Sequence, residues 1–191
     1  YRDVAATHER FVTPDKPNAV LLARQNISIN LADADFPALN IAVAILGGDP
    51  LKARLGDRIR QQDGLSYNVG AGLSADESRT GRDDNGSLSI QAIAAPENMG
   101  KLEAALREEL ARLVADGITA EELRSAVAEK KVAREQSRAA DGAIAGLLSD
   151  HLYYGRDMSF EAQRDAAYQA LTVEQVNAAI RKHLKPERLS V

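Results

Sequence analysis

The sequence predicts an α+β fold in which an antiparallel sheet is covered on one face by helices. Patterns typical of strands are grouped early in the chain, and long helical patterns are grouped late. The links between predicted strands have hairpin length, whereas a doubly wound parallel sheet needs a helical crossover between its strands. With 191 residues, 45% of them hydrophobic, the chain can bury a sizeable core, and we expect one domain over residues 1–191.

The first part of the chain carries one long strand and two helices. Apolar residues cluster and then alternate over residues 19–29, which predicts the strand. A helix is expected over residues 36–46, because Asp35 and a nearby proline provide a start and two glycines follow its end. A second, amphipathic helix is expected over residues 51–62, where Gly64 ends it.

Two further strands follow. Residues 65–69 alternate with a period of two, and we expect this strand to reach residue 74. The polar stretch over residues 74–86 is expected to form a turn or a long hairpin loop, and residues 87–94 return as the next strand. Together with the first strand, these two should form a single antiparallel sheet.

The rest of the chain is predicted to be mainly helical. Beyond Pro96, leucines recur at helical spacing as far as Leu113, which gives a stripe that should pack on a single face of the sheet. Thr119 and Thr172 each begin a capping-box pattern, the signature of a helix start. Three more helices and the start of a last strand are expected over residues 119–138, 141–154, 173–183 and 188–191, in that order.

The overall charge excludes some classes of partner. The chain has 24 Lys and Arg against 28 Asp and Glu, with a pI near 5.5. It offers no basic field for phosphates, so we expect neither nucleic acid nor a membrane as a partner. The longest apolar run, Ile41 to Leu46, is too short to cross a bilayer. Because the chain begins at Tyr1, we expect it to be part of a longer polypeptide.

Metal ligands are sparse. The chain has no cysteine, which excludes disulfides, thiolate zinc sites and a cysteine nucleophile. The three histidines, His8, His151 and His183, stand alone, without a second histidine three or four residues away. A lone histidine on a helix is usually a packed or surface residue, and His183 in a last helical turn can interact with the helix dipole. We therefore expect the isolated chain to bind no stoichiometric zinc.

Other familiar motifs are incomplete. Gly70-Ala71-Gly72 followed by Ala75 fits a loose dinucleotide pattern, but the residues beyond it are acidic and loop-like instead of opening a helix. The Asp83 to Gly86 run lacks the glutamate that closes a calcium loop, since Ala92 stands at that position. No G-x-S-x-G elbow is present, which argues against an autonomous hydrolase.

One segment carries a more specific pattern. Arg54 and Leu55 stand early in the predicted helix, Arg60 stands near its end, Gly64 stops it, and Tyr67 follows Arg60 by seven residues. Across a tight turn, a helix end and a strand start lie side by side, so a guanidinium and a phenol could both donate to one oxygen. This segment resembles the C-terminal, zinc-free domain of insulinase/pitrilysin-type zinc metallopeptidases, including the mitochondrial processing peptidase branch.

The resemblance extends along nearly the whole chain, from the Pro14-Asp15-Lys16 entry to the helix start after Gly117. It implies half of a peptidase clamshell, in which a homologous domain or subunit holds zinc through an inverted H-x-x-E-H motif. This domain would bind no metal itself and would close over a peptide. Carried over by position, Arg60 and Tyr67 are the catalytic and substrate-binding residues, gripping the peptide backbone and stabilising the oxyanion. Family members in the bacterial periplasm favour a periplasmic location, with the cytoplasm as the alternative.

Simpler interpretations accompany this one. Tyr67 could be an ordinary half-buried tyrosine, and Arg60 could pair on the surface with Asp57 or Asp63. Ala53 and the Gln61-Gln62-Asp63 run depart from the commoner family pattern, although neither change touches the proposed donors. At the level of the whole protein, the alternative is a non-catalytic core or regulatory subunit with the same fold.

Overall fold

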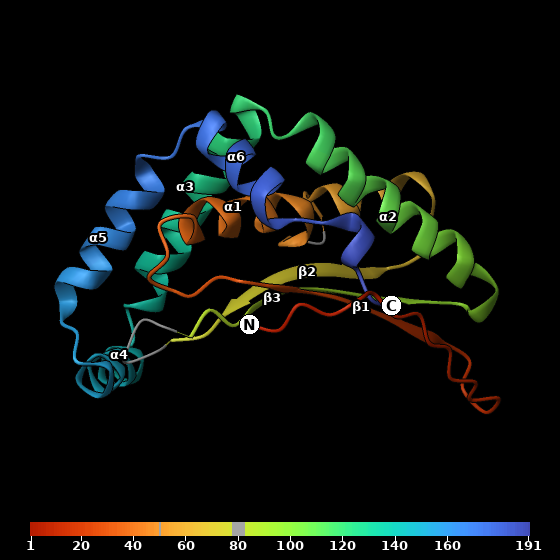
Figure 1. The fold of residues 1–191 in the computed structure, drawn as a ribbon, viewed down its shortest axis with the longest axis horizontal. Helices are drawn as coiled ribbons and strands as arrows, with labels where there is room; N and C mark the ends of the chain where they lie inside the picture. The colour runs from red at the N-terminus through yellow and green to blue at the C-terminus, as the bar shows by residue number, and fades with distance from the viewer. Residues whose placement is uncertain (50, 78–82) are drawn as a thin grey trace.

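An antiparallel sheet forms one layer of the fold, beneath the main helices in the view of Figure 1. This computed structural model describes residues 1–49, 51–77 and 83–191. Within them the sheet has three strands in the spatial order β1, β3, β2, and both pairings are antiparallel. The strands are β1 Ala19–Ile27, β2 Asn68–Ala75 and β3 Gly86–Ala94. The predicted α+β class is therefore confirmed.

The two faces of the sheet differ in burial. Leu21 of β1 pairs with Ala92 of β3, and both are buried in the core. Val20 and Leu22, which alternate with Leu21 along the strand, are 57% and 64% exposed. This is the period-two pattern of a sheet that packs on a core with one face and leaves the other open.

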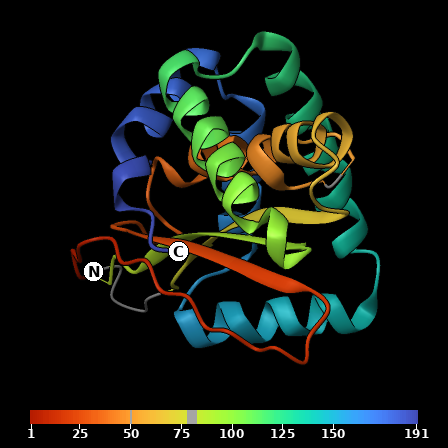
Figure 2. The same ribbon diagram turned by 90° about the vertical axis from the view of Figure 1, so that its right-hand side faces the viewer.

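Helices α1 (Phe36–Gly47), α2 (Met99–Asp116) and α6 (Val173–His183) cover the buried face of the sheet (Figures 1 and 2). The predicted leucine stripe of α2 forms part of the core, and all its members are fully buried: Leu102, Leu106, Leu110 and Leu113. Each such burial removes enough apolar surface from water to contribute about 1.5–3 kcal/mol. The packing of this helix layer thus fixes the sheet below it.

Close approach of α1 to β2 depends on a glycine. A Cβ placed on Gly47 would lie 2.6 Å from the backbone nitrogen of Ala71, closer than real contacts allow. The missing side chain lets the end of α1 sit directly on the strand. The C-terminal end of α1 is consequently held against β2.

Helices α3 (Ala120–Ser137), α4 (Asp141–Tyr154) and α5 (Met158–Gln169) complete the second half of the chain. Figures 1 and 2 show α4 outside the main helix layer, beside the end of the sheet where β2 finishes. The predicted capping boxes at Thr119 and Thr172 are both present, and α3, α4 and α6 match their predicted ranges closely.

Helix α5 was not predicted from the sequence. Its buried side chains are Glu161 and Tyr168, so it shows no apolar stripe. Its start does carry a local signal, because the side chain of Asp157 accepts a hydrogen bond from the backbone N–H of Ser159 at 2.8 Å.

Boundaries in the middle of the chain differ from prediction. Regular helix begins at Arg54, not at residue 51, and Gly56–Gln62 forms a π-helix, η1. The following strand begins at Asn68 instead of residue 65. Of the predicted loop over residues 74–86, the part from 78 to 82 lies outside the described residues. Two short 3₁₀ helices, η2 (Pro96–Asn98) and η3 (Pro186–Arg188), complete the elements.

The outer edge of β1 is paired to the chain ends. Arg24 and Ser190 exchange backbone hydrogen bonds, each 2.9 Å long, so the predicted strand start over residues 188–191 is reduced to an isolated bridge. Beyond it, Val191 exchanges backbone hydrogen bonds with Thr7 and Glu9. No helix in the described part of the chain is long and apolar enough to span a membrane.

Candidate functional site

The proposed site lies where η1 leads into β2. The buried side of this helical segment is formed by Leu55 and Ile59, neither of which is exposed. Before it, the carboxylate of Asp49 accepts a hydrogen bond from the backbone N–H of Leu51 at 2.7 Å. The π-helical winding adds a residue to the turn, and single π-turns occur frequently at functional sites.

A tight turn joins η1 to β2. Gly64 has a φ of 62°, a left-handed conformation that glycine adopts without strain. On either side of it, Asp63 N–H donates to the carbonyl of Arg58 at 3.0 Å, and Leu65 N–H donates to that of Ile59 at 2.9 Å. Ser66 then anchors the strand start by donating to the carbonyl of Ile93 at 2.6 Å. Tyr67 follows directly after this fixed point.

Arg60 and Tyr67 are both exposed at this corner. Tyr67 is 68% exposed, so the half-buried alternative is wrong. The surface-pair alternative for Arg60 is also wrong, because Asp63 pairs with Arg58 at 2.5 Å and Asp57 accepts from Gln62 at 2.6 Å. Within residues 1–49, 51–77 and 83–191, neither Arg60 nor Tyr67 has a hydrogen bond or an ion pair.

The nearby arginines are engaged. The guanidinium of Arg54 donates to Glu122 at 2.6 and 2.8 Å and to the carbonyl of Gly117 at 2.8 Å. Burial alone would raise the pKa of Glu122, but hydrogen bonds from Arg54 and Thr119 outweigh it and lower that pKa. The local motif around Arg54 gave no indication of this partner, because Glu122 lies 68 residues further along the chain.

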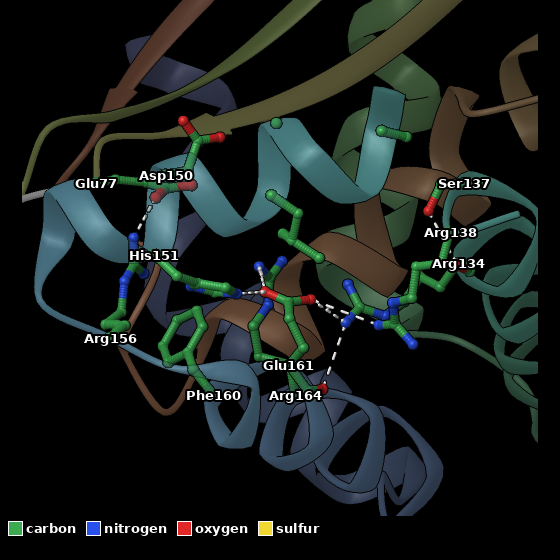
Figure 3. A pocket seen from close by; sticks show the side chains of 13 residues that line it. Glu77, Arg134, Ser137, Arg138, Asp150, His151, Arg156, Phe160, Glu161 and Arg164 are labelled. Atoms are coloured by element: carbon green, nitrogen blue, oxygen red, sulfur yellow. Dashed lines mark hydrogen bonds and ion pairs between the residues drawn. The ribbon is translucent and has the colours of Figure 1, made fainter. Parts of the chain in front are cut away.

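A cavity of about 400 Å³ lies elsewhere, between α3, α4 and α5 (Figure 3). At its centre, the buried carboxylate of Glu161 binds Arg134 at 2.6 Å, and Arg138 and Arg164 at 3.5 Å. Asp165 also accepts from Arg138, at 2.7 Å. Because these cations and carboxylates pair with one another, this part of the cavity wall is a structural ion network between α3 and α5.

The histidines are separated in space. His151 Nε2 lies 3.6 Å from Glu161, His183 Nε2 lies 2.8 Å from Asp35, and His8 bonds Glu103. No cluster of three His, Cys, Asp or Glu side chains suited to a metal occurs among the described residues. The described residues therefore do not fit a zinc site on this chain.

Comparison with known proteins now decides the family. A family model described as the peptidase M16 inactive domain matches residues 2–130. The chain belongs to the peptidase M16 inactive-domain family. The resemblance to insulinase/pitrilysin-type peptidases is thereby confirmed. A comparison with curated proteins gives no significant match.

Solved structures share the M16 inactive-domain fold. The peptidase M16 inactive domain from Pseudomonas fluorescens is 26% identical with a TM-score of 0.80, over 97% of this chain and 42% of that one. The inactive peptidase domain of a candidate zinc protease from Bordetella parapertussis is 20% identical, with a TM-score of 0.74 over 94% of both chains. The periplasmic protease PqqL from Escherichia coli is also 20% identical with a TM-score of 0.74, over 98% of this chain and 20% of its own. This chain thus spans less than half of the Pseudomonas structure.

Proposed function

We propose that this M16 domain binds peptide and stabilises the transition state in a zinc metalloendopeptidase whose zinc belongs to a homologous domain or subunit. The main observation behind this proposal is that Arg60 and Tyr67, at the η1–β2 corner, are exposed donors without a partner in the described structure. Around them, Arg54 and Arg58 are both engaged in ion pairs. A substrate would supply the acceptors that Arg60 and Tyr67 lack.

The two donors suit different stages of peptide hydrolysis. The guanidinium of Arg60 can donate to a backbone carbonyl of the bound peptide before and during reaction. The phenol of Tyr67 donates a hydrogen bond to the oxyanion that develops on the attacked carbonyl, as in an oxyanion hole. Metal chemistry, the activation of water and polarisation of the carbonyl, belongs in this proposal to the partner domain.

The proposed partners follow from the same site. The ligand is an unfolded or short peptide, and the second partner is the zinc-bearing domain that completes the active site. The periplasmic name of the Escherichia coli neighbour supports a periplasmic location. A non-catalytic scaffold subunit of the same fold is the competing function, and it requires nothing of Arg60 or Tyr67.

Substitution of Tyr67 by Phe tests the proposal. The variant keeps the ring and removes one donor, so turnover of a peptide by the complete two-domain enzyme should lose about 10²–10³ in kcat. Because the side chain is 68% exposed and has no partner, the melting temperature should stay unchanged. A near-wild-type kcat with an unchanged melt would remove the oxyanion role and favour the scaffold function.

A further inference from the structure

We propose that Arg54 is a positioning residue that holds Arg60 and Tyr67 in place for substrate. The inference rests on the proposed function. It assigns a role to Arg54, the arginine of the motif whose side chain bonds to α3 and to the end of α2 and is not one of the two exposed donors. It follows from three features of the corner: the partners of Arg54, the helical spacing of the arginines, and the few other polar ties of η1.

Arg54 connects three structural elements through one side chain. Its Nε and Nη2 atoms donate to the two carboxylate oxygens of Glu122 in α3, and Nη2 also donates to the carbonyl of Gly117 at the end of α2. The side chain is only 18% exposed, and that of Glu122 is 27% exposed. Such partly buried, bidentate contacts fix geometry more strongly than an exposed ion pair.

Glu122 is itself immobilised. The oxygen that accepts from Arg54 Nη2 also accepts from the backbone N–H of Thr119 at 2.7 Å and from its hydroxyl at 3.0 Å. The bond from the Thr119 N–H is one half of the capping box of α3, and the other half is the bond from the Glu122 backbone N–H to the Thr119 hydroxyl oxygen at 3.2 Å. The start of the η1 segment is therefore tied to a rigid helix junction.

Helical spacing separates the tie from the site. Arg54 and Arg58 are four residues apart and share one side of the helical segment, where Arg58 reaches Glu108 of α2. Arg60 follows two residues later, on roughly the opposite side, and is exposed. Arg54 and Arg58 thus attach one side of the segment to α3 and α2, while Arg60 is exposed to solvent on the other side.

Loss of the Arg54 tie would shift the corner without unfolding it. Leu55 and Ile59 would still bury one side of the segment, but the remaining charged contact to α2, from Arg58 to Glu108, is 3.3 Å long and involves a carboxylate that is 60% exposed. A displacement of about 1 Å at a reacting group can cost on the order of 10² in rate. A lysine at position 54 could not span the carboxylate and the carbonyl together, since it lacks the planar fork.

The experiment measures peptide turnover by the complete two-domain peptidase carrying Arg54→Lys. We expect kcat/KM to fall by roughly 10- to 100-fold, at a temperature well below the melt. In a Tyr67→Phe background the same substitution should cost only a few-fold, because one of the two donors that Arg54 positions is already gone. Glu122→Gln, which keeps the side chain's shape and weakens the same tie, should reproduce the loss in milder form.

A matched control is Arg134→Lys. Arg134 is also a half-buried arginine shared by two carboxylates, but in the α3–α5 network. It should lower the melting temperature at least as much as Arg54→Lys and leave kcat and KM unchanged. Equal kinetic losses in both variants would reduce Arg54 to a general structural role and overturn the inference.

Further outcomes separate this inference from the function beneath it. The positioning role would be overturned if Arg54→Lys showed wild-type kinetics, or if its loss of activity were strictly additive in free energy with that of Tyr67→Phe. The proposed function would still be supported in that case, provided that Tyr67→Phe alone slows the enzyme. A Tyr67→Phe enzyme with full activity would remove the proposed function itself, and the positioning role with it.

Discussion

The molecule uses arginine in two opposite ways, in the α3–α5 network and at the η1–β2 corner. In the network, Arg134 and Arg138 share the carboxylates of Glu161 and Asp165, and these ion pairs hold α3 and α5 together. At the corner, Arg60 and Tyr67 are both exposed and have no partner within the described residues.

The difference shows where each region obtains its partners. A buried guanidinium needs acceptors from the chain itself, since leaving it unpaired would carry a large desolvation cost. An exposed guanidinium is satisfied by water and can exchange that water for a ligand. Stability and substrate binding should therefore respond separately to substitutions in the two regions.

The largest effect is expected in the network. Glu161→Gln removes the charge shared by three arginines, which should lower the free energy of unfolding by about 3 kcal/mol. For a domain of this size, the melting temperature should fall by roughly 6–12 °C. Peptide turnover by the complete enzyme, measured below the melt, should not change. A slower enzyme with an intact fold would show that the network also serves the active site.

At the corner, Arg60→Ala should act on kinetics alone. A lost hydrogen bond from a charged donor is worth about 1.5–3 kcal/mol, so kcat/KM should fall by roughly 10- to 100-fold. Because Arg60 would grip the peptide in both ground and transition states, KM should rise as kcat falls. Arg60→Lys should recover little, since a point charge cannot replace the planar fork. An unchanged KM would contradict ground-state binding by this residue.

The smallest expected effect is on the pH dependence of stability, which the ion pairs of the α3–α5 network should influence. The pKa of Asp165 lies below its ordinary 3.8, chiefly through the hydrogen bond from Arg138. For Glu161, burial would raise the pKa, but Arg134 and the neighbouring cations outweigh burial and hold it below 4.5. Lowered pKa values stabilise the fold above the unfolded-state values, and that stability is lost as pH falls through the folded-state ones.

Melting curves recorded from pH 7 downward check this pH dependence. Stability should be retained to about pH 4.5 and then decline, and Glu161→Gln should show a shallower decline because one of the linked groups is missing. If stability declined equally steeply with falling pH in the wild type and in Glu161→Gln, Glu161 would not contribute to acid unfolding.

Much of the fold could be predicted because it depends on local patterns. The leucine stripe of α2 and the capping boxes at Thr119 and Thr172 each lie within a few residues of sequence. Helix α5 escaped prediction because it buries Glu161 against arginines of another helix, and ion pairs across 23 to 27 residues leave no periodic signal.

The candidate site was predictable only in part. Spacing placed Arg60 and Tyr67 across the Gly64 turn, and the family resemblance gave them a role. The surface partners considered for Arg60 were wrong, because Arg58 occupies Asp63. The tie from Arg54 to Glu122 depends on the tertiary fold, so no local motif could reveal it.

Convergence of Arg60 and Tyr67 on one substrate is tested most directly by a double-mutant cycle in the complete enzyme. Arg60→Ala, Tyr67→Phe and the combined variant are compared by kcat/KM on one peptide. If both donors serve the same carbonyl, the combined loss should be smaller than the product of the single losses, with an interaction energy of at least about 1 kcal/mol. Strictly multiplicative losses would show two independent residues and contradict a shared site.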